Sequence, residues 1–438
     1  MKRLFSNIGW LLGGRGFNAV MSLVYLYLAT HTLGLEQFGY FALIVALGQA
    51  ITGFANFQTW QFIVRWGANG EGDEPARDSE NLREATGFAI ALDMLSIALG
   101  TALAAIVTFT AHLWLPLPAD LLWLTFGYCV VSLAAIRATP TGLLRLHFKF
   151  ATATAAEAVQ PAIRTAGAAL AVVFMPSVMG FILAWAASEV AVAIALWVAA
   201  GRTQRIDLSA LSFRRIPEKH PEAWSFVWST NMSGSLNIAG KQVIILLVGT
   251  FGGAALAGGF RVAAQLGQAL VSLAQTVSKA IFPELVHAKE NALTMARRMA
   301  NIAVVAGVIA VLVALFGGRW ALAAIAEDDF SAFYWAMVIL SIAGAVELVG
   351  ASLESLLVSA GRAGTAFAVR AVPTVLALVL LDAAIDWNGA KGAAFAVLGS
   401  SSLAVLGFYV AILNMQEIRI TLGSEDETGE PATPPSLP

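Results

Sequence analysis

The amino-acid sequence predicts an all-α integral membrane protein with about 12 transmembrane helices in two six-helix lobes. Hydrophobic residues make up 58% of the 438 residues and charged residues only 12%, and the mean hydropathy is +0.75. A soluble protein of this size needs far more charge to cover its surface. The tetrapeptide LGQA occurs at 47–50 and again at 266–269, half a chain length later. A repeat at this spacing indicates duplicated halves, as in many transporters.

The first lobe is expected to cover residues 1–200. A membrane-spanning helix needs about 20 apolar residues, and Arg15 interrupts the first apolar stretch, which favours a retained span over a cleaved leader. Turn-rich stretches such as GANGEGDEP and LPLPAD separate the spans that follow. The six spans expected here are 8–30, 38–64, 85–109, 121–143, 153–175 and 180–200.

The second lobe is expected to cover residues 224–414. A cytoplasmic linker at 201–223, which carries five Lys or Arg residues, is predicted to join the lobes. The acidic, Pro-rich tail at 415–438 has no apolar period, so we expect it to be disordered. The six spans expected in this lobe are 224–249, 255–282, 299–316, 331–360, 367–385 and 392–414.

The distribution of Lys and Arg predicts the orientation. Of the 26 basic residues, 17 fall in segments on the side of the N-terminus, and only Arg319 and Lys391 fall in the opposite loops. By the positive-inside rule both termini are expected in the cytoplasm. With six spans in each half, the second half enters the membrane in the same orientation as the first. The repeat is therefore expected to be parallel, with its axis along the membrane normal.

Three stretches carry a resemblance to a known family. LGLEQFGYFAL at 33–43 resembles the connection between the first two spans of bacterial polysaccharide transporters, and GLLRLHFKF at 142–150 resembles their fourth-to-fifth connection. The longest match, residues 230–285, is similar to their seventh and eighth spans. The family is that of the O-antigen and exopolysaccharide repeat-unit flippases, which are related to the multidrug and toxin extruders and to the lipid II flippases. One position departs from the pattern, because His31 in LATHTLG stands where the family often has Arg.

The resemblance implies a fold like that of the multidrug and toxin extruders and a flippase function. The substrate would be an undecaprenyl-pyrophosphate-linked oligosaccharide, moved by alternating access from the inner to the outer leaflet of the bacterial cytoplasmic membrane for cell-surface polysaccharide synthesis, including lipopolysaccharide. The partners would be this lipid-linked oligosaccharide, membrane lipid, a polysaccharide polymerase and a chain-length protein. A net charge of −2 excludes bulk basic attraction to nucleic acid.

Ionisable residues inside spans are the residues most directly linked to function, since each costs about 2.5–3.5 kcal/mol on insertion scales. A pyrophosphate needs at least two cations, and Arg serves best because its planar fork holds two oxygens at once. The resemblance implies that the first and seventh spans face the interior, which favours Arg15 and Lys241. The candidates for a cationic, substrate-binding cavity are Arg15, Arg164, Lys241, Arg261 and Arg370.

A second reading assigns the buried charges to pairing between helices or to a gate. Buried charges are commonly paired with one another. At an offset of 217, Arg137 matches Glu354, so an Arg and a Glu at equivalent positions of facing lobes could form a gate pair. Pro140, Pro161 and Pro373 lie within expected spans and could kink them. The residues with a possible gate or coupling role are Arg137, Glu354, Asp93, Glu157 and Glu189.

No enzyme or cofactor signature is present in the sequence. There is no Walker A loop, no nucleophile elbow and no Cys or His cluster with metal spacing, so no catalytic residue, cofactor or metal is expected. Two other functions remain open. An ion-coupled exporter of drugs or organic cations would share the fold and would use Asp93, Glu157 and Glu189. A glycosyl polymerase would need a large outer loop, and the longest one, about 317–330, is short and partly apolar.

Overall fold

The computed structural model describes residues 2–67, 80–285, 292–359 and 362–426, and these residues form α-helices and short 3-10 helices with no strand among them. In the first half the helices are α1 (Lys2–Ala55), α2 (Thr59–Trp66), α3 (Glu80–Phe109), α4 (Leu122–Ala134), α5 (Ala138–Leu146), α6 (Phe150–Glu157), α7 (Val159–Phe174) and α8 (Val178–Thr203). The short α9 (Arg215–Lys219) lies in the connection.

The second half consists of a few long helices. They are α10 (Ala223–Leu285), α11 (Ala292–Ile325), α12 (Tyr334–Ser359), α13 (Ala363–Val379) and α14 (Leu381–Asp426). The 3-10 helices are η1 (Ala111–Leu113), η2 (Ala119–Leu121), η3 (Leu208–Ala210) and η4 (Asp328–Phe333). α14 continues through residues 415–426, which we expected to be disordered, and the rest of that tail lies outside the described residues.

Several helices merge two expected spans across a break. Gly34 has a φ of 65° and interrupts α1 between the expected spans 8–30 and 38–64. Gly253, with a φ of 84°, interrupts α10 between 224–249 and 255–282 in the same way. Glycine accepts these left-handed angles without a steric penalty. Eight described segments are long and apolar enough to cross a membrane, and the expected all-α membrane fold is confirmed.

Two further breaks lie inside expected spans. Residues 56–58 separate α1 from α2, and residues 135–137 separate α4 from α5. Pro140 lies in the first turn of α5, where the missing backbone N–H of proline costs no helical hydrogen bond, so it begins a helix after a break. α6 and α7 are separated only by Ala158, which keeps helical angles (φ −66°, ψ −16°), so Pro161 lies at an interruption of a nearly continuous helix, as a kink requires. Pro373 is the one of the three that lies inside a helix, α13.

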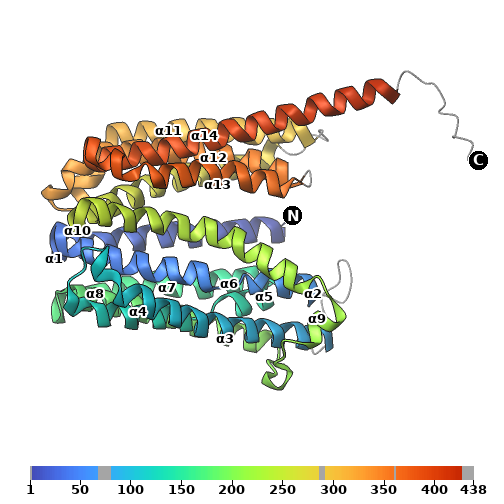
Figure 1. Cartoon of the computed structure of the whole chain (residues 1–438), viewed down its shortest axis with the longest axis horizontal. Coiled ribbons are helices and arrows are strands. Elements are labelled where there is room, and N and C mark those ends of the chain that lie inside the picture. Colours follow the sequence, from blue (N-terminus) through green and yellow to red (C-terminus); the bar gives the residue numbers. More distant parts are fainter. Residues whose placement is uncertain (1, 68–79, 286–291, 360–361, 427–438) are drawn as a thin grey trace, which may run out of the picture.

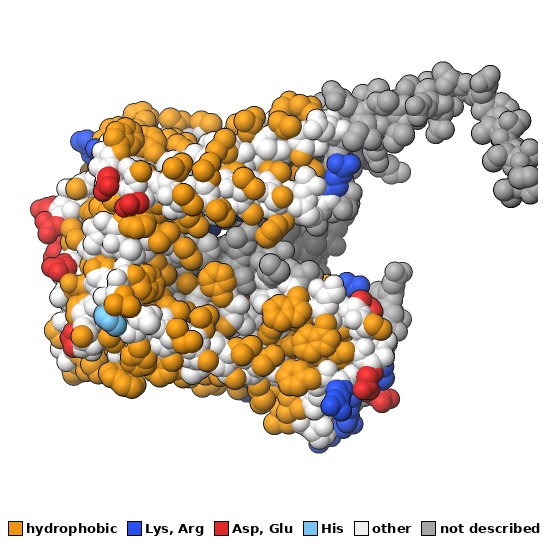
Figure 2. Space-filling view, in the orientation of Figure 1, with side chains coloured by type: hydrophobic (Ala, Val, Ile, Leu, Met, Phe, Trp, Pro, Cys, Tyr) orange, Lys and Arg blue, Asp and Glu red, His pale blue; other side chains and the backbone are white. Residues whose placement is uncertain are grey.

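The helices are arranged in two groups with α1 and α10 between them (Figure 1). The helices α2 to α8 lie on one side and α11 to α14 on the other. Hydrophobic side chains cover most of the face shown in Figure 2, and charged side chains gather at its two ends. This distribution matches a protein surrounded by lipid, whose charges lie in the two interfacial regions. In Figure 2 the molecule is also hollowed at its right-hand end, between the two groups.

α1 and α10 meet in a tightly packed seam that is formed by residues related by the 219-residue repeat. A Cβ on Gly39 would overlap the carbonyl oxygen of Ala254, and one on Gly258 would lie 2.9 Å from the carbonyl oxygen of Leu35. Arg261 Nη1 donates to the carbonyl oxygen of Ala42 at 3.1 Å, again across an interval of 219 residues. Residues one repeat apart therefore lie opposite each other where the two long helices are in close backbone contact.

The connection between α8 and α10 is held against the start of α3. Lys219 Nζ donates to Glu84 Oε2 at 2.6 Å, and Arg83 Nε lies 2.7 Å from Asp207 Oδ2. The hydrogen bond to Glu84 raises the pKa of Lys219. Hydrogen bonds from Ser209, followed by the charge of Arg83, lower the pKa of Asp207. Both ion pairs favour the docked position of this connection.

Candidate functional site

The candidate site lies where the two helix breaks of the first half meet. Asp93 of α3 is 1% exposed and joins them. Its Oδ1 accepts a hydrogen bond from the Thr59 hydroxyl at 3.1 Å, and its Oδ2 accepts one from the Thr139 hydroxyl at 2.5 Å. The two hydroxyls are 3.2 Å apart. Because Thr59 begins α2 and Thr139 lies in the first turn of α5, Asp93 fixes both breaks relative to α3. No cation contacts Asp93 in the described part of the chain.

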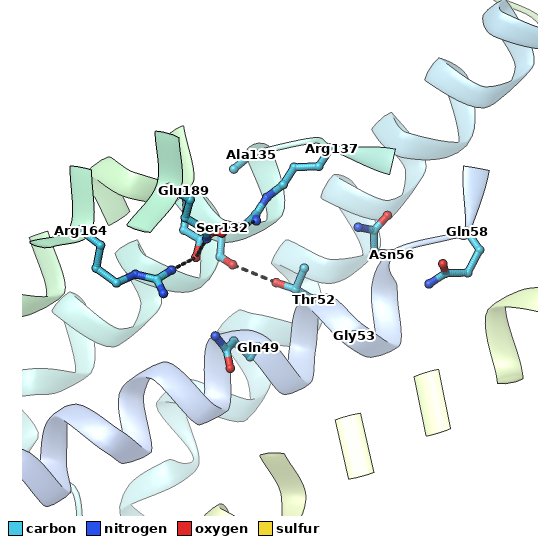
Figure 3. A pocket seen from close by; sticks show the side chains of 11 residues that line it. Gln49, Thr52, Gly53, Asn56, Gln58, Ser132, Ala135, Arg137, Arg164 and Glu189 are labelled. Atoms are coloured by element: carbon cyan, nitrogen blue, oxygen red, sulfur yellow. Dashed lines mark hydrogen bonds and ion pairs between the residues drawn. The ribbon is translucent and has the colours of Figure 1, made fainter. Parts of the chain in front are cut away.

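Beside these breaks lies a cavity of about 480 Å³. It is lined by residues of α1, α4, α7 and α8 and of the two breaks. Figure 3 shows the cavity from close by, with charged side chains toward one wall and neutral polar side chains along α1 and the first break. The lining residues are Gln49, Thr52, Gly53, Asn56, Gln58, Ser132, Ala135, Arg137, Gln160, Arg164 and Glu189.

The charged wall consists of two arginines that share one carboxylate. Glu189 of α8 is 3% exposed. Arg137 Nη2 is in ion-pair contact with its Oε2, and Arg164 Nη2 lies 3.3 Å from its Oε1. Gln160 Nε2 donates to the same Oε1 at 3.0 Å, while Gln160 Oε1 accepts from Arg137 Nη1 at 3.2 Å. Two positive charges and one negative charge leave this wall with a net charge of +1.

Arg164 is held in place by an aromatic side chain as well as by Glu189. Its guanidinium carbon lies 3.6 Å from the centre of the Trp185 ring, and its Nε lies 3.4 Å from the Ser188 hydroxyl. The Trp185 ring packs edge-on against Tyr25 at 5.1 Å, and the Arg261 guanidinium carbon lies 5.6 Å from the centre of the Trp185 ring. A stacked guanidinium keeps its N–H groups free for hydrogen bonds in its own plane.

The opposite wall carries amides and hydroxyls without charge. Gln49 and Asn56 make no side-chain hydrogen bond within the described residues, so both amides are available to a ligand. Gln58 accepts from Trp60 Nε1 at 3.0 Å, and its NH₂ group has no hydrogen-bond partner in the described part of the chain. The Thr52 hydroxyl lies 3.2 Å from that of Ser132, which joins α1 to α4. Amides and hydroxyls of this kind match the alternating donors and acceptors of sugar hydroxyls.

The second half contains a smaller polar cluster. Arg370 Nη2 donates to Glu354 Oε2 at 2.6 Å, and Lys241 Nζ lies 3.6 Å from Glu347 Oε2. A cavity of about 40 Å³ lies between Glu347 and Arg370. The charges in this cluster balance, with two basic and two acidic residues. It therefore offers no net attraction for an anion.

The structure brings only part of the predicted substrate site together. Arg164 lines the large cavity, whereas Arg261 is buried against Ala42 and the Phe41 ring. Lys241 and Arg370 belong to the second cluster. Arg15 lies on α1, but its side chain is outside the described residues. A substrate contact by any of these residues stays a prediction.

The predicted gate or coupling residues are also separated. Arg137 pairs with Glu189 and Glu354 with Arg370, so Arg137 and Glu354 are not paired with each other in this conformation. Their expected contact rested on equivalence under the repeat, and equivalent positions in two lobes need not touch. Glu157 is exposed at the end of α6 and makes no ion pair among the described residues. The neutral wall was not predicted, because only charged residues were sought within the spans. Among the described residues, no group of three or more His, Cys, Asp or Glu side chains could hold a metal ion.

Comparisons with known proteins agree with this architecture. Residues 4–289 match the model of a family described as polysaccharide biosynthesis protein. The chain is 29% identical over 333 residues to the inner membrane protein YghQ of Escherichia coli strain K12, covering 72% of this chain and 89% of that protein.

Solved structures share the fold at low sequence identity. An inward-facing multidrug resistance MATE family transporter is similar with a TM-score of 0.68 and 15% identity, covering 92% of this chain and 96% of its own. The lipid II flippase MurJ in an inward closed conformation is similar with a TM-score of 0.69 and 12% identity. The match covers 93% of this chain and 87% of the MurJ chain. The expected MATE-like fold is therefore confirmed.

Proposed function

The chain belongs to the polysaccharide biosynthesis protein family, and from this premise we propose that it flips a polyprenyl-pyrophosphate-linked oligosaccharide across the cytoplasmic membrane. The lipid carrier would be undecaprenol, and the polysaccharide an O-antigen or exopolysaccharide. The observation that carries the proposal is the cavity beside the helix breaks, with two arginines on one wall and neutral amides on the other.

The chemistry of the cavity matches the two polar parts of such a substrate. The pyrophosphate diester carries two negative charges at neutral pH and would lie against Arg137 and Arg164, whose guanidinium groups can each hold two oxygens. The first sugars would then lie against Gln49, Asn56 and Gln58. The polyprenyl chain would remain in the surrounding lipid. A flippase needs only such binding and a conformational change, which is consistent with the absence of an enzyme signature in the sequence.

An exporter of organic cations is less well supported by the same cavity. Among the lining residues that the structure describes, Glu189 is the only acid, and two arginines already neutralise it. Asp93 is enclosed by two threonine hydroxyls and is not a lining residue. A cationic drug would therefore face a net positive wall. The proposed role of Asp93 and Glu157 in ion coupling remains a proposal without a contact that supports it.

The proposed orientation places both termini and the linker 201–223 in the cytoplasm. It is supported by the 17 of 26 basic residues on that side. Figure 2 also shows several Lys and Arg side chains at the hollowed right-hand end, where the substrate would enter. The two lobes, residues 1–200 and 224–414, would then move apart and together at the seam between α1 and α10, which is closed in this conformation. The lipid-linked substrate is the direct partner in this proposal. A polymerase and a chain-length protein would act on the product.

The test is transport of a defined substrate into proteoliposomes. Purified protein would be reconstituted with a fluorescent polyprenyl-pyrophosphate disaccharide, and its exposure outside would be followed by loss of fluorescence on adding a membrane-impermeant quencher. We expect Arg137→Gln and Arg164→Gln each to slow transport by about 10- to 100-fold, the equivalent of a lost charged hydrogen bond of about 1.5–3 kcal/mol. The matched control is Arg202→Gln at the exposed end of α8. Wild-type protein that fails to move this lipid would contradict the proposed function.

A further inference from the structure

We infer that Glu189 is an internal counter-anion, which holds Arg137 and Arg164 while the cavity is empty and is displaced by the phosphates of the substrate. The inference rests on the proposed function, because it assigns a role within the same cavity. It goes further by naming the residue that sets how tightly a phosphate is held and how readily it leaves.

The contacts place one carboxylate where an anionic ligand would bind. Each oxygen of Glu189 faces one arginine, Oε2 facing Arg137 and Oε1 facing Arg164 at 3.3 Å. All three side chains line the cavity, and Figure 3 shows the Glu189 carboxylate between the two guanidinium groups. A phosphate that enters the cavity therefore competes with Glu189 for the same N–H donors.

The charges explain why an empty site needs such an anion. Arginine remains protonated in proteins, and a buried cation without a partner destabilises the fold strongly. Glu189 supplies that partner when no substrate is bound. The site then carries a net charge of +1, against a ligand that carries two negative charges. This difference in charge favours replacement of the carboxylate by phosphate. Because Glu189 remains available to compete for the arginines, the phosphate can also leave.

Gln160 can hold Glu189 by a hydrogen bond both when the cavity is empty and when a phosphate is bound. Its Nε2 donates to Glu189 Oε1 at 3.0 Å, and its Oε1 accepts from Arg137 at 3.2 Å. A carboxylate that loses its arginines can keep this neutral donor. Because Gln160 contacts both members of the ion pair, it also keeps Glu189 within reach of Arg137 when the phosphate departs. Return of Glu189 to the arginines then assists release of the substrate.

The proposal predicts opposite changes in affinity and turnover when the charge of Glu189 is removed. In Glu189→Gln the side chain keeps its shape and loses its charge, so the two arginines become available to phosphate. We expect undecaprenyl pyrophosphate, presented in zwitterionic lipid nanodiscs, to bind about 10- to 100-fold more tightly. Transport in proteoliposomes should show a lower KM together with a lower kcat, because release becomes slow. Inorganic pyrophosphate and phosphatidylglycerol serve as further probes, which separate a pyrophosphate site from one for any lipid phosphate.

Two further variants make the result decisive. Glu218→Gln, which removes an exposed carboxylate on α9 in the linker, is the matched control and should change neither quantity. Glu189→Asp is one methylene shorter and keeps at most one arginine contact, so it should bind undecaprenyl pyrophosphate several-fold more tightly even if Glu189→Gln fails to fold. Unchanged or weaker binding in the folded Glu189 variants would overturn the inference while the proposed function stands. Wild-type protein that binds no undecaprenyl pyrophosphate would overturn both, and equal binding of phosphatidylglycerol would overturn the assignment to pyrophosphate.

Discussion

Gly39 offers a direct way to test whether the seam between α1 and α10 is the closed side of a transporter. Its Cα faces the carbonyl group of Ala254 with no room for a methyl group, and Gly258 approaches the backbone of α1 from the other helix. The surrounding side chains are closely packed, since Phe38 is 1% exposed and lies edge-on to Phe330 at 5.9 Å. Gly39→Ala must therefore push the two backbones apart.

The expected size of this effect follows from overpacking a buried contact. An extra methyl group in a well-packed core costs about 1–3 kcal/mol. If the seam opens during transport, the penalty falls on the closed seam alone and shifts the equilibrium toward the open one by about 5- to 150-fold. If the seam never opens, the same penalty lowers the stability of the protein, and the residues of the seam stay buried.

Cysteine labelling distinguishes these two outcomes. A reporter at Ala257, which is 0% exposed at the seam, would be placed in a Cys129→Ala background and treated with a membrane-impermeant maleimide. We expect Gly39→Ala to raise the labelling rate of Ala257→Cys at least fivefold, within the range given above. The control is Gly127→Ala, because a Cβ on Gly127 meets nothing within 4 Å. Labelling that stays as slow as in the parent, with reduced thermal stability, would refute the seam as a gate.

Two further predictions concern the groups that hold the site and the linker in place. Asp93→Leu removes the acceptor of two buried hydroxyls, Thr59 and Thr139, and should lower the free energy of unfolding by about 1–3 kcal/mol per unsatisfied group. Asp93→Asn keeps one acceptor oxygen, so its free energy of unfolding should fall by less. Equal thermal stability of both variants and wild type would contradict this role. The pKa of Asp207 is lowered in the folded protein, so its contribution to linker docking is complete above the ordinary pKa of aspartate and is lost as the pH falls through the lowered value. Proteolysis of the linker 201–223 by pepsin, corrected for the pH dependence of pepsin on an unfolded substrate, should accordingly increase across that acidic range by more in wild type than in Asp207→Asn. Identical pH profiles would argue against a role for the Asp207 charge in docking the linker.

The positions of the major helix breaks could be predicted from the sequence, because glycine and turn residues mark them. Gly34 and Gly253 each lie between two expected spans, and the length of the apolar stretches was enough to place those spans. The breaks at 56–58 and 135–137 were missed, because each lies inside an apolar stretch long enough to span the membrane. Asn56, Gln58 and Arg137 are the polar residues that mark them in hindsight.

Pairing between charges was less predictable than their presence. Arg137, Arg164 and Glu189 each stood out because a charge within a span is costly. Their meeting depends on how α7 and α8 and the break before α5 pack, which a single sequence does not specify. The repeat offset matched Arg137 with Glu354, but each of them has a nearer partner in its own half of the chain. The cavity therefore became evident only from the structure.

The central claim is most directly tested by finding which leaflet holds the lipid-linked oligosaccharide in cells. A strain without the gene would be complemented with wild-type protein, with the double variant Arg137→Gln, Arg164→Gln, or with nothing. Intact and lysed spheroplasts would then be treated with a glycan-specific probe that cannot cross the membrane. The account predicts that the oligosaccharide is accessible only after lysis in the empty strain and with the double variant, and accessible in intact spheroplasts with wild-type protein. Full accessibility in intact spheroplasts without the gene would contradict it.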